Sequence, residues 1–134
     1  MFKITKIIAL AFSLIAGSVF AGETPQVSQQ ELLSALKAPN NNIVILDVRS
    51  EEEYNQGHIA DAVNMSHDMI ADNLSKLAQY KNKTVVVHCR SGHRAGIAEK
   101  ILTKNGFSDL RHLTGDMNGW VEAKLPVVSN KAAH

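Results

Sequence analysis

The order of apolar and polar residues along the chain switches between the period of a strand and the period of a helix. Residues 43–46 are continuously apolar and residues 84–88 are mostly β-branched, which predicts two strands buried on both faces. Residues 69–78 and 97–102 instead carry apolar side chains at helical spacing. This alternation predicts an α/β domain with a mostly parallel sheet that is covered by helices on both faces.

Two helices are marked by their first turns. Ser28 and Ser50 are each followed by a glutamate three positions later, which is a capping box that satisfies N–H groups at a helix start. The first box predicts a helix over residues 28–38, and the second predicts a short helix that stops at Gly57. We therefore expect one helix on each side, along the chain, of the strand over residues 43–46.

Shorter elements complete the pattern. A brief strand is expected over residues 62–64, and a last strand around residues 107–113. A final helix should carry Trp120 and end before Pro126.

The helix around residues 97–102 is amphipathic. Its apolar positions, Ile97 among them, form one stripe, and Glu99 and Lys100 lie outside that stripe. We expect the stripe to pack on the sheet and both charged side chains to face water.

The first 21 residues have the three parts of a secretory signal peptide. Two lysines precede an apolar stretch over residues 7–16, and small residues occupy the two cleavage-determining positions. We expect cleavage after Ala21, which leaves residues 22–134 as one domain, located in the periplasm if the organism is Gram-negative. The alternative is a membrane anchor, but the stretch is shorter than the roughly 20 residues that a spanning helix needs. After cleavage no membrane association is expected.

Charge and cysteine content narrow the function. The formal net charge is +1 at pH 7, and loss of the two leader lysines brings the mature domain close to neutrality. Because no basic patch is present, nucleic acid is not an expected partner. The single cysteine, Cys89, excludes a disulfide within the chain, so the stability of the domain must come from packing. We also expect the protein to be a monomer. A lone thiol in an oxidising compartment needs a functional explanation.

The strand over residues 84–88 runs directly into a loop with the chemistry of a binding site. The loop consists of Cys89, Arg90, Ser91, Gly92, His93 and Arg94. In open α/β sheets, loop N–H groups and the positive end of the next helix attract anions at the carboxyl ends of strands. Gly92 allows the turn, and Arg90 and Arg94 add two charges. Because each contribution favours thiolate over thiol, we predict that Cys89 is a nucleophile.

Other interpretations of these residues are weaker. A buried structural cysteine would not require a glycine and two arginines beside it. His93 either tunes the site or contributes only its backbone N–H, and the sequence leaves both roles open. His88 and Cys89 are neighbours on a strand and point to opposite faces, so no metal site is expected.

Four blocks of the chain together resemble the rhodanese family. They are Asp47-Val48-Arg49; Glu53-Tyr54 with Gly57-His58-Ile59, Ala62 and Asn64; the loop from Cys89 to Arg94; and Gly115 and Trp120 with Leu125-Pro126-Val127. The resemblance covers nearly all of the mature domain and implies a three-layer α/β/α fold around a five-stranded, mostly parallel sheet.

The family usually has glycine at three turn positions where this chain has Asp61, Asp116 and Lys124. These departures leave the geometry of the three turns open, because aspartate tolerates a left-handed conformation moderately and lysine poorly.

The resemblance also implies a reaction, sulfur transfer without a metal or an organic cofactor. The Cys89 thiolate would attack the outer sulfur of thiosulfate or a similar small anionic donor and release sulfite. A thiol or cyanide would then take the sulfur from the Cys89 persulfide. The loop N–H groups of Arg90 to Arg94, with the side chain of Arg90 or Arg94, would bind the donor and then the persulfide.

Two other functions are compatible with the same resemblance. The related phosphatases and arsenate reductases have a seven-residue loop, whereas the six-residue loop of this chain is a smaller cradle that favours sulfur. A non-catalytic binding module would have no need of the cysteine.

Four further residues match the family and are expected to fix loops through ion pairs or hydrogen bonds: Asp47, Arg49, Glu53 and His58.

Overall fold

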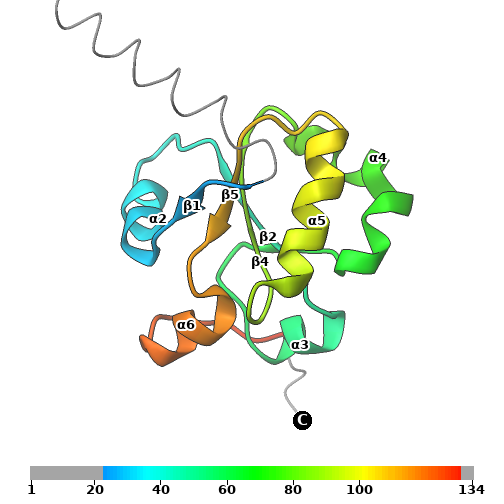
Figure 1. Ribbon diagram of the computed structural model, residues 1–134. Helices are drawn as coiled ribbons and strands as arrows, with labels where there is room; N and C mark the ends of the chain where they lie inside the picture. Colours follow the sequence, from blue (N-terminus) through cyan, green and yellow to red (C-terminus); the bar gives the residue numbers. More distant parts are fainter. Residues whose placement is uncertain (1–22, 131–134) are drawn as a thin grey trace, which may run out of the picture.

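A sheet of five parallel strands forms the centre of the domain in the computed structural model, which describes residues 23–130 (Figure 1). From one edge to the other the strands are β1 (Gln26–Val27), β5 (Leu110–Leu113), β4 (Thr84–His88), β2 (Ile43–Asp47) and β3 (Val63–Asn64). All neighbouring pairs are parallel, which confirms the predicted α/β fold with a five-stranded sheet. The predicted signal peptide lies outside the described residues.

Helices cover both faces of this sheet and complete three layers. The α-helices are α2 (Gln29–Leu36), α3 (Glu51–Gln56), α4 (Leu74–Leu77), α5 (His93–Lys104) and α6 (Asp116–Glu122). The helices α4 and α5 lie on one side of the sheet, and α2 and α6 lie on the other (Figure 1). Their side chains join two separate hydrophobic clusters, one on each face. Within residues 23–130, no helix is both long enough and apolar enough to cross a membrane.

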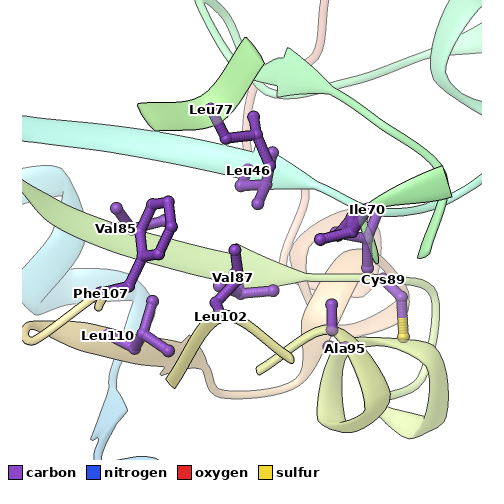
Figure 2. Close-up of a cluster of buried hydrophobic side chains, with 12 residues drawn as sticks. Leu46, Ile70, Leu77, Val85, Val87, Cys89, Ala95, Leu102, Phe107 and Leu110 are labelled. Atoms are coloured by element: carbon purple, nitrogen blue, oxygen red, sulfur yellow. The ribbon is translucent and has the colours of Figure 1, made fainter. Parts of the chain in front are cut away.

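The alternation of side chains along β4 divides the hydrophobic core into two clusters. Val85 and Val87 point toward α5, where they join Leu102 (Figure 2). Val86 points to the opposite face and joins the cluster that contains Trp120. Because successive residues of a strand face opposite sides, a strand that is apolar throughout fits a sheet buried between two layers.

Both predicted capping boxes are present. The Glu31 N–H donates to Ser28 Oγ (3.0 Å), and the Ser28 N–H donates to the Glu31 carboxylate (2.9 Å). Ser50 and Glu53 exchange the same pair of bonds at the start of α3. The four-residue pattern therefore locates the starts of α2 and α3 correctly, although α2 ends two residues before the predicted limit.

The prediction of one continuous amphipathic helix over residues 69–78 is wrong. The segment contains η1 (His67–Met69), η2 (Ala71–Asn73), the short α4, and η3 (Ala78–Tyr80). The Asn73 side-chain amide donates to the Met69 carbonyl, and the Asn73 backbone N–H bonds to Ile70 instead. A local side-chain bond thus replaces the backbone bond that a continuous α-helix requires.

Two further expectations need correction. The last strand begins at Leu110 and not near Phe107, and the two-residue strand β1 was not predicted. On α5, Ile97 is 39% exposed, whereas Glu99, expected to face water, is 6% exposed. Glu99 is buried because its carboxylate pairs with a histidine on β5, as described below.

Candidate active site

Cys89 lies at the junction between the sheet and the predicted loop. It directly follows β4, and its residue surface is only 1% exposed. The side chain belongs to the cluster that contains Ile70 and Ala95, at the end of that cluster nearest the loop (Figure 2). Burial alone would also suit a structural cysteine, so the contacts of the sulfur decide between the two interpretations.

The sulfur is a hydrogen-bond acceptor of the loop. The Gly92 N–H lies 3.0 Å from Cys89 Sγ. Gly92 has φ 120°, which is a conformation open to glycine, so the sequence prediction that Gly92 permits the turn is confirmed. The helix α5 begins at the next residue, His93, and its first N–H groups lack acceptors within the helix. An N–H donor and a helix N-terminus are the surroundings in which reactive cysteines are found in proteins.

The first residues of α6 fix the start of the loop through the backbone. The Cys89 N–H donates to Asp116 Oδ1 (2.9 Å), and the Met117 N–H donates to the Cys89 carbonyl (3.0 Å). The Asn118 N–H donates to the Arg90 carbonyl (3.1 Å). Both peptide groups of Cys89 are therefore held by a helix that lies 27 residues further along the chain.

His88 contacts the same loop from the sheet. Its Nδ1 lies 3.0 Å from the Cys89 carbonyl, and burial lowers its pKa, so a neutral imidazole donates this bond. The other nitrogen is 3.6 Å from the Asp47 carboxylate and has no hydrogen-bond partner among residues 23–130. Asp47 is paired with Arg49 (2.7 Å), and Arg49 also donates to the Gly57 carbonyl. Asp47 and Arg49, which were expected to fix loops through ion pairs or hydrogen bonds, thus pair with each other.

Arg94 is engaged by Glu53. Two guanidinium nitrogens donate to the two carboxylate oxygens at 2.7 and 3.1 Å, which joins α5 to α3. The hydrogen bonds from Arg94 are the main reason why the pKa of Glu53 falls to about 2, against the opposing effect of burial. Charge-assisted pairs of this bidentate form define geometry well. One of the two guanidinium groups that were expected to bind the donor therefore has a structural partner.

The remaining side chains of the loop face outward. Arg90, Ser91 and His93 are exposed, and their side chains make no hydrogen bond or ion pair within the described part of the chain. Arg90 is consequently a cation at the mouth of the loop with its donors available. For His93 the two roles stay open, although its N–H belongs to the first turn of α5.

Residues 28–123 match the sequence profile of the rhodanese-like domain. The chain belongs to that family. The resemblance that the four motif blocks indicated is thus confirmed.

Relatives of this rhodanese-like domain include sulfurtransferases at modest identity. A protein named sulfurtransferase from Allochromatium vinosum is 31% identical over 99 residues, which are 74% of this chain and 91% of that protein. The thiosulfate sulfurtransferase PspE of Escherichia coli K12 is 31% identical over 70 residues, which are 52% of this chain and 67% of PspE. The chain spans only 50% of protein slr1261 from Synechocystis, to which it is 35% identical.

A solved structure supports the fold. The rhodanese-related protein from Thermoplasma volcanium superposes with a TM-score of 0.67 at 25% identity, over 78% of this chain and 97% of that one.

This rhodanese-like domain keeps left-handed turns at the three positions where the family usually has glycine. Asp61, Asp116 and Lys124 have φ of 68°, 53° and 60°. A left-handed conformation carries a cost for any side chain, and that cost is lowest for glycine, asparagine and aspartate. The geometry of the three turns, which the sequence left open, is therefore left-handed in this chain.

Sequence reasoning missed a buried cluster beneath the loop of the rhodanese-like domain. His112 of β5 lies between two carboxylates, with Nδ1 2.6 Å from Glu99 and Nε2 3.0 Å from Asp116. The hydrogen bonds to Asp116 and Glu99 raise the pKa of His112 to about 10. We name these three residues the acid–histidine cluster. The only sequence signal was Asp116 itself, an acidic residue where the family usually has glycine.

The acid–histidine cluster predicts a pH dependence of stability. The folded-state pKa of His112 lies above the ordinary value of 6.5, so its contribution is complete below pH 6.5 and is lost as the pH rises through about 10. We expect the stability margin of the parent over an Asp116→Asn variant to shrink between pH 6.5 and pH 10, as measured by urea denaturation. A margin that stays constant over this range would show that His112 is not held as a cation by Asp116.

Proposed function

We propose that this rhodanese-like domain is a sulfurtransferase that carries sulfur as a persulfide on Cys89. The observation that carries the proposal is the Gly92 N–H directed at the Cys89 sulfur at the N-terminus of α5. A thiolate is the reactive form of cysteine, and this position stabilises it. The sulfurtransferases among the relatives support the same chemistry.

The reaction proceeds in two displacements. The Cys89 thiolate attacks the outer sulfur of thiosulfate, the sulfur–sulfur bond of the donor breaks, and sulfite leaves with the bonding electron pair. The terminal sulfur of the resulting persulfide is an anion bonded to Cys89 Sγ, one S–S bond further into the ring of loop N–H groups, which stabilise it there. A thiolate or cyanide then attacks that terminal sulfur and regenerates the Cys89 thiolate.

Thiosulfate or a similarly small anion is the donor we favour. Arg90 is exposed at the mouth of the loop with no ion-pair partner among the described residues, and it is suited to attract the anionic oxygens of the donor. The activity in the name of PspE points to the same donor class. Arg94 contributes mainly through Glu53, since that pair anchors the first turn of α5.

A cysteine-dependent phosphatase or arsenate reductase is the second candidate, and two observations disfavour it. The loop holds only four residues between Cys89 and Arg94, which leaves a small ring of N–H groups. The pair with Glu53 also occupies one N–H on each terminal nitrogen of Arg94, which leaves fewer of its donors for a tetrahedral oxyanion.

Intact-mass spectrometry tests the proposal directly. The purified domain, incubated with thiosulfate, should gain the mass of one sulfur atom, and a thiol reductant should remove it. The same preparation should hydrolyse aryl phosphates at no more than the background rate. Absence of the adduct with thiosulfate and with organic persulfide donors, together with appreciable phosphatase activity, would refute the proposal in favour of the second candidate.

A further inference from the structure

The acid–histidine cluster has contacts that stability alone does not explain. Its three side chains come from three elements, α5, β5 and α6, and the Asp116 side chain is 4% exposed. Burial opposes ionisation of Asp116, but the hydrogen bonds from His112 and from the Cys89 N–H bring its pKa below the ordinary value. Asp116 is therefore a buried anion, and each of its carboxylate oxygens accepts a hydrogen bond from one specific donor.

The Asp116 carboxylate contacts both ends of the tight turn from Cys89 to Gly92. Oδ1 accepts the Cys89 N–H at 2.9 Å. Oδ2 lies 3.3 Å from the point where a side chain on Gly92 would begin, so the carboxylate fills the space directly beneath Gly92. Cys89 and Gly92 thus both lie against the same carboxylate.

We propose that Asp116, oriented by His112 and Glu99, is a positioning residue that holds the Cys89 loop in the conformation in which the Gly92 N–H faces the sulfur. This inference rests on the proposed function of Cys89, because it concerns how that loop is prepared for sulfur transfer. Asp116 touches the loop backbone and not the donor. Its effect on the sulfur is exerted through the Cys89 peptide group and through Gly92.

The backbone at Asp116 supports a role for the side chain. A residue at φ 53° is better served by glycine, and the family usually has glycine there. The aspartate nevertheless occupies the position, and its carboxylate makes two hydrogen bonds that glycine cannot make. These two hydrogen bonds offset the cost of a side chain at a left-handed position.

Positioning and charge make opposite predictions for the thiolate. Of the charged groups around the loop, Arg94 from α5 interacts electrostatically with Cys89, and Asp116 from α6, paired with His112 of β5, accepts the Cys89 backbone N–H. His88 from β4 is buried and neutral. If Asp116 acted only as a nearby negative charge, removing it would favour the thiolate and lower the pH at which Cys89 becomes reactive. If Asp116 positions the Gly92 N–H, removing it weakens that bond and raises this pH.

Two variants separate these effects because both fit the backbone and both remove the charge. Asp116→Gly removes the acceptor, and glycine adopts a left-handed conformation freely. Asp116→Asn keeps an oxygen that can accept the Cys89 N–H and an amide that can donate to a neutral His112, and asparagine also tolerates a left-handed conformation. Thermal unfolding of both variants checks that each is folded.

The decisive measurement is the rate of Cys89 alkylation by iodoacetamide as a function of pH. For Asp116→Gly we expect the midpoint to rise by roughly half a unit to one unit, which corresponds to the loss of one ordinary hydrogen bond. The rate constant of persulfide formation should fall on the order of tenfold. Asp116→Asn should stay within about twofold of the parent in persulfide formation, with its midpoint at or slightly below that of the parent.

Two results would overturn the inference. Equal downward shifts of the midpoint in both variants would show that Asp116 acts only through its charge. A glycine variant with the midpoint and the rate of the parent would show that the carboxylate is a packing feature. Alkylation needs no sulfur donor, so a parent that takes up no sulfur would refute the proposed function while the alkylation comparison still decided the role of Asp116.

Discussion

A Cys89→Ser variant should lose sulfur transfer by more than about 10³-fold, because a serine hydroxyl is not ionised at neutral pH and cannot hold a stable outer sulfur. The fold should persist. The serine hydroxyl can accept the Gly92 N–H in place of the sulfur, which lies 3.0 Å from that nitrogen. Formation of thiocyanate from thiosulfate and cyanide measures the activity, and intact mass shows whether any sulfur is taken up.

The burial of Cys89 refines what this variant does to stability. Cys89 is 1% exposed and belongs to the hydrophobic cluster that contains Ile70 and Ala95, so the thiol contributes some packing as well as chemistry. We expect a loss of about 1 kcal/mol in the free energy of unfolding, as is typical of a small polar change at a partly satisfied site. Cys89→Ala is the matched control, since it removes the acceptor of the Gly92 N–H. Thiocyanate formation at the parent rate by either variant would show that Cys89 is not the nucleophile.

The elements that sequence reasoning located well are those specified by a few adjacent residues. The capping boxes at Ser28 and Ser50 each consist of two side chains within four positions, and both are formed. The strand β4 is equally local, because a β-branched run can be buried on both faces only in the middle of a sheet. Its position next to Cys89 then placed the loop at the correct edge of the sheet.

The elements that sequence reasoning missed depend on residues far away. The strand β1 has two residues and exists because Pro25 and Val27 accept hydrogen bonds from His112 and Thr114, which lie far along the chain in and just after β5. Such a short segment has no period to detect. In the segment over residues 67–80, a single side-chain bond from Asn73 was sufficient to interrupt a helical pattern.

In the candidate site, too, the features specified by adjacent residues were predicted and those that depend on distant residues were missed. The order of residues in the loop predicted the conformation of Gly92 and the approach of an N–H group to the sulfur, because both are properties of the loop itself. Helical spacing placed Glu99 in water, since its partner His112 lies 13 residues further along the chain and on another element. The bond from Cys89 to Asp116 and the pair of Arg94 with Glu53 likewise join distant segments.

The second large effect concerns the size of the loop. One glycine inserted between Gly92 and His93 should reduce the rate of persulfide formation by about 10²-fold, comparable to the loss of one donor in an oxyanion hole. Both ends of the loop are anchored, so the extra residue has to enlarge the ring. Cys89 is held by β4 and α6, and the first turn of α5 is held by the bond between Gly96 and Gly92 and by the pair of Arg94 with Glu53.

The enlarged ring moves the Gly92 N–H away from the sulfur, and that displacement is the cause of the expected loss. A wider ring should also bind a tetrahedral oxyanion better than the parent does, which competition by inorganic phosphate against iodoacetamide would reveal. The matched control is one glycine inserted between Asn40 and Asn41, an exposed turn before β2, which changes the chain length equally and should leave the persulfide yield unchanged. If the loop insertion formed the persulfide as fast as this control, the fit of a six-residue loop to sulfur would not be what determines the chemistry at Cys89.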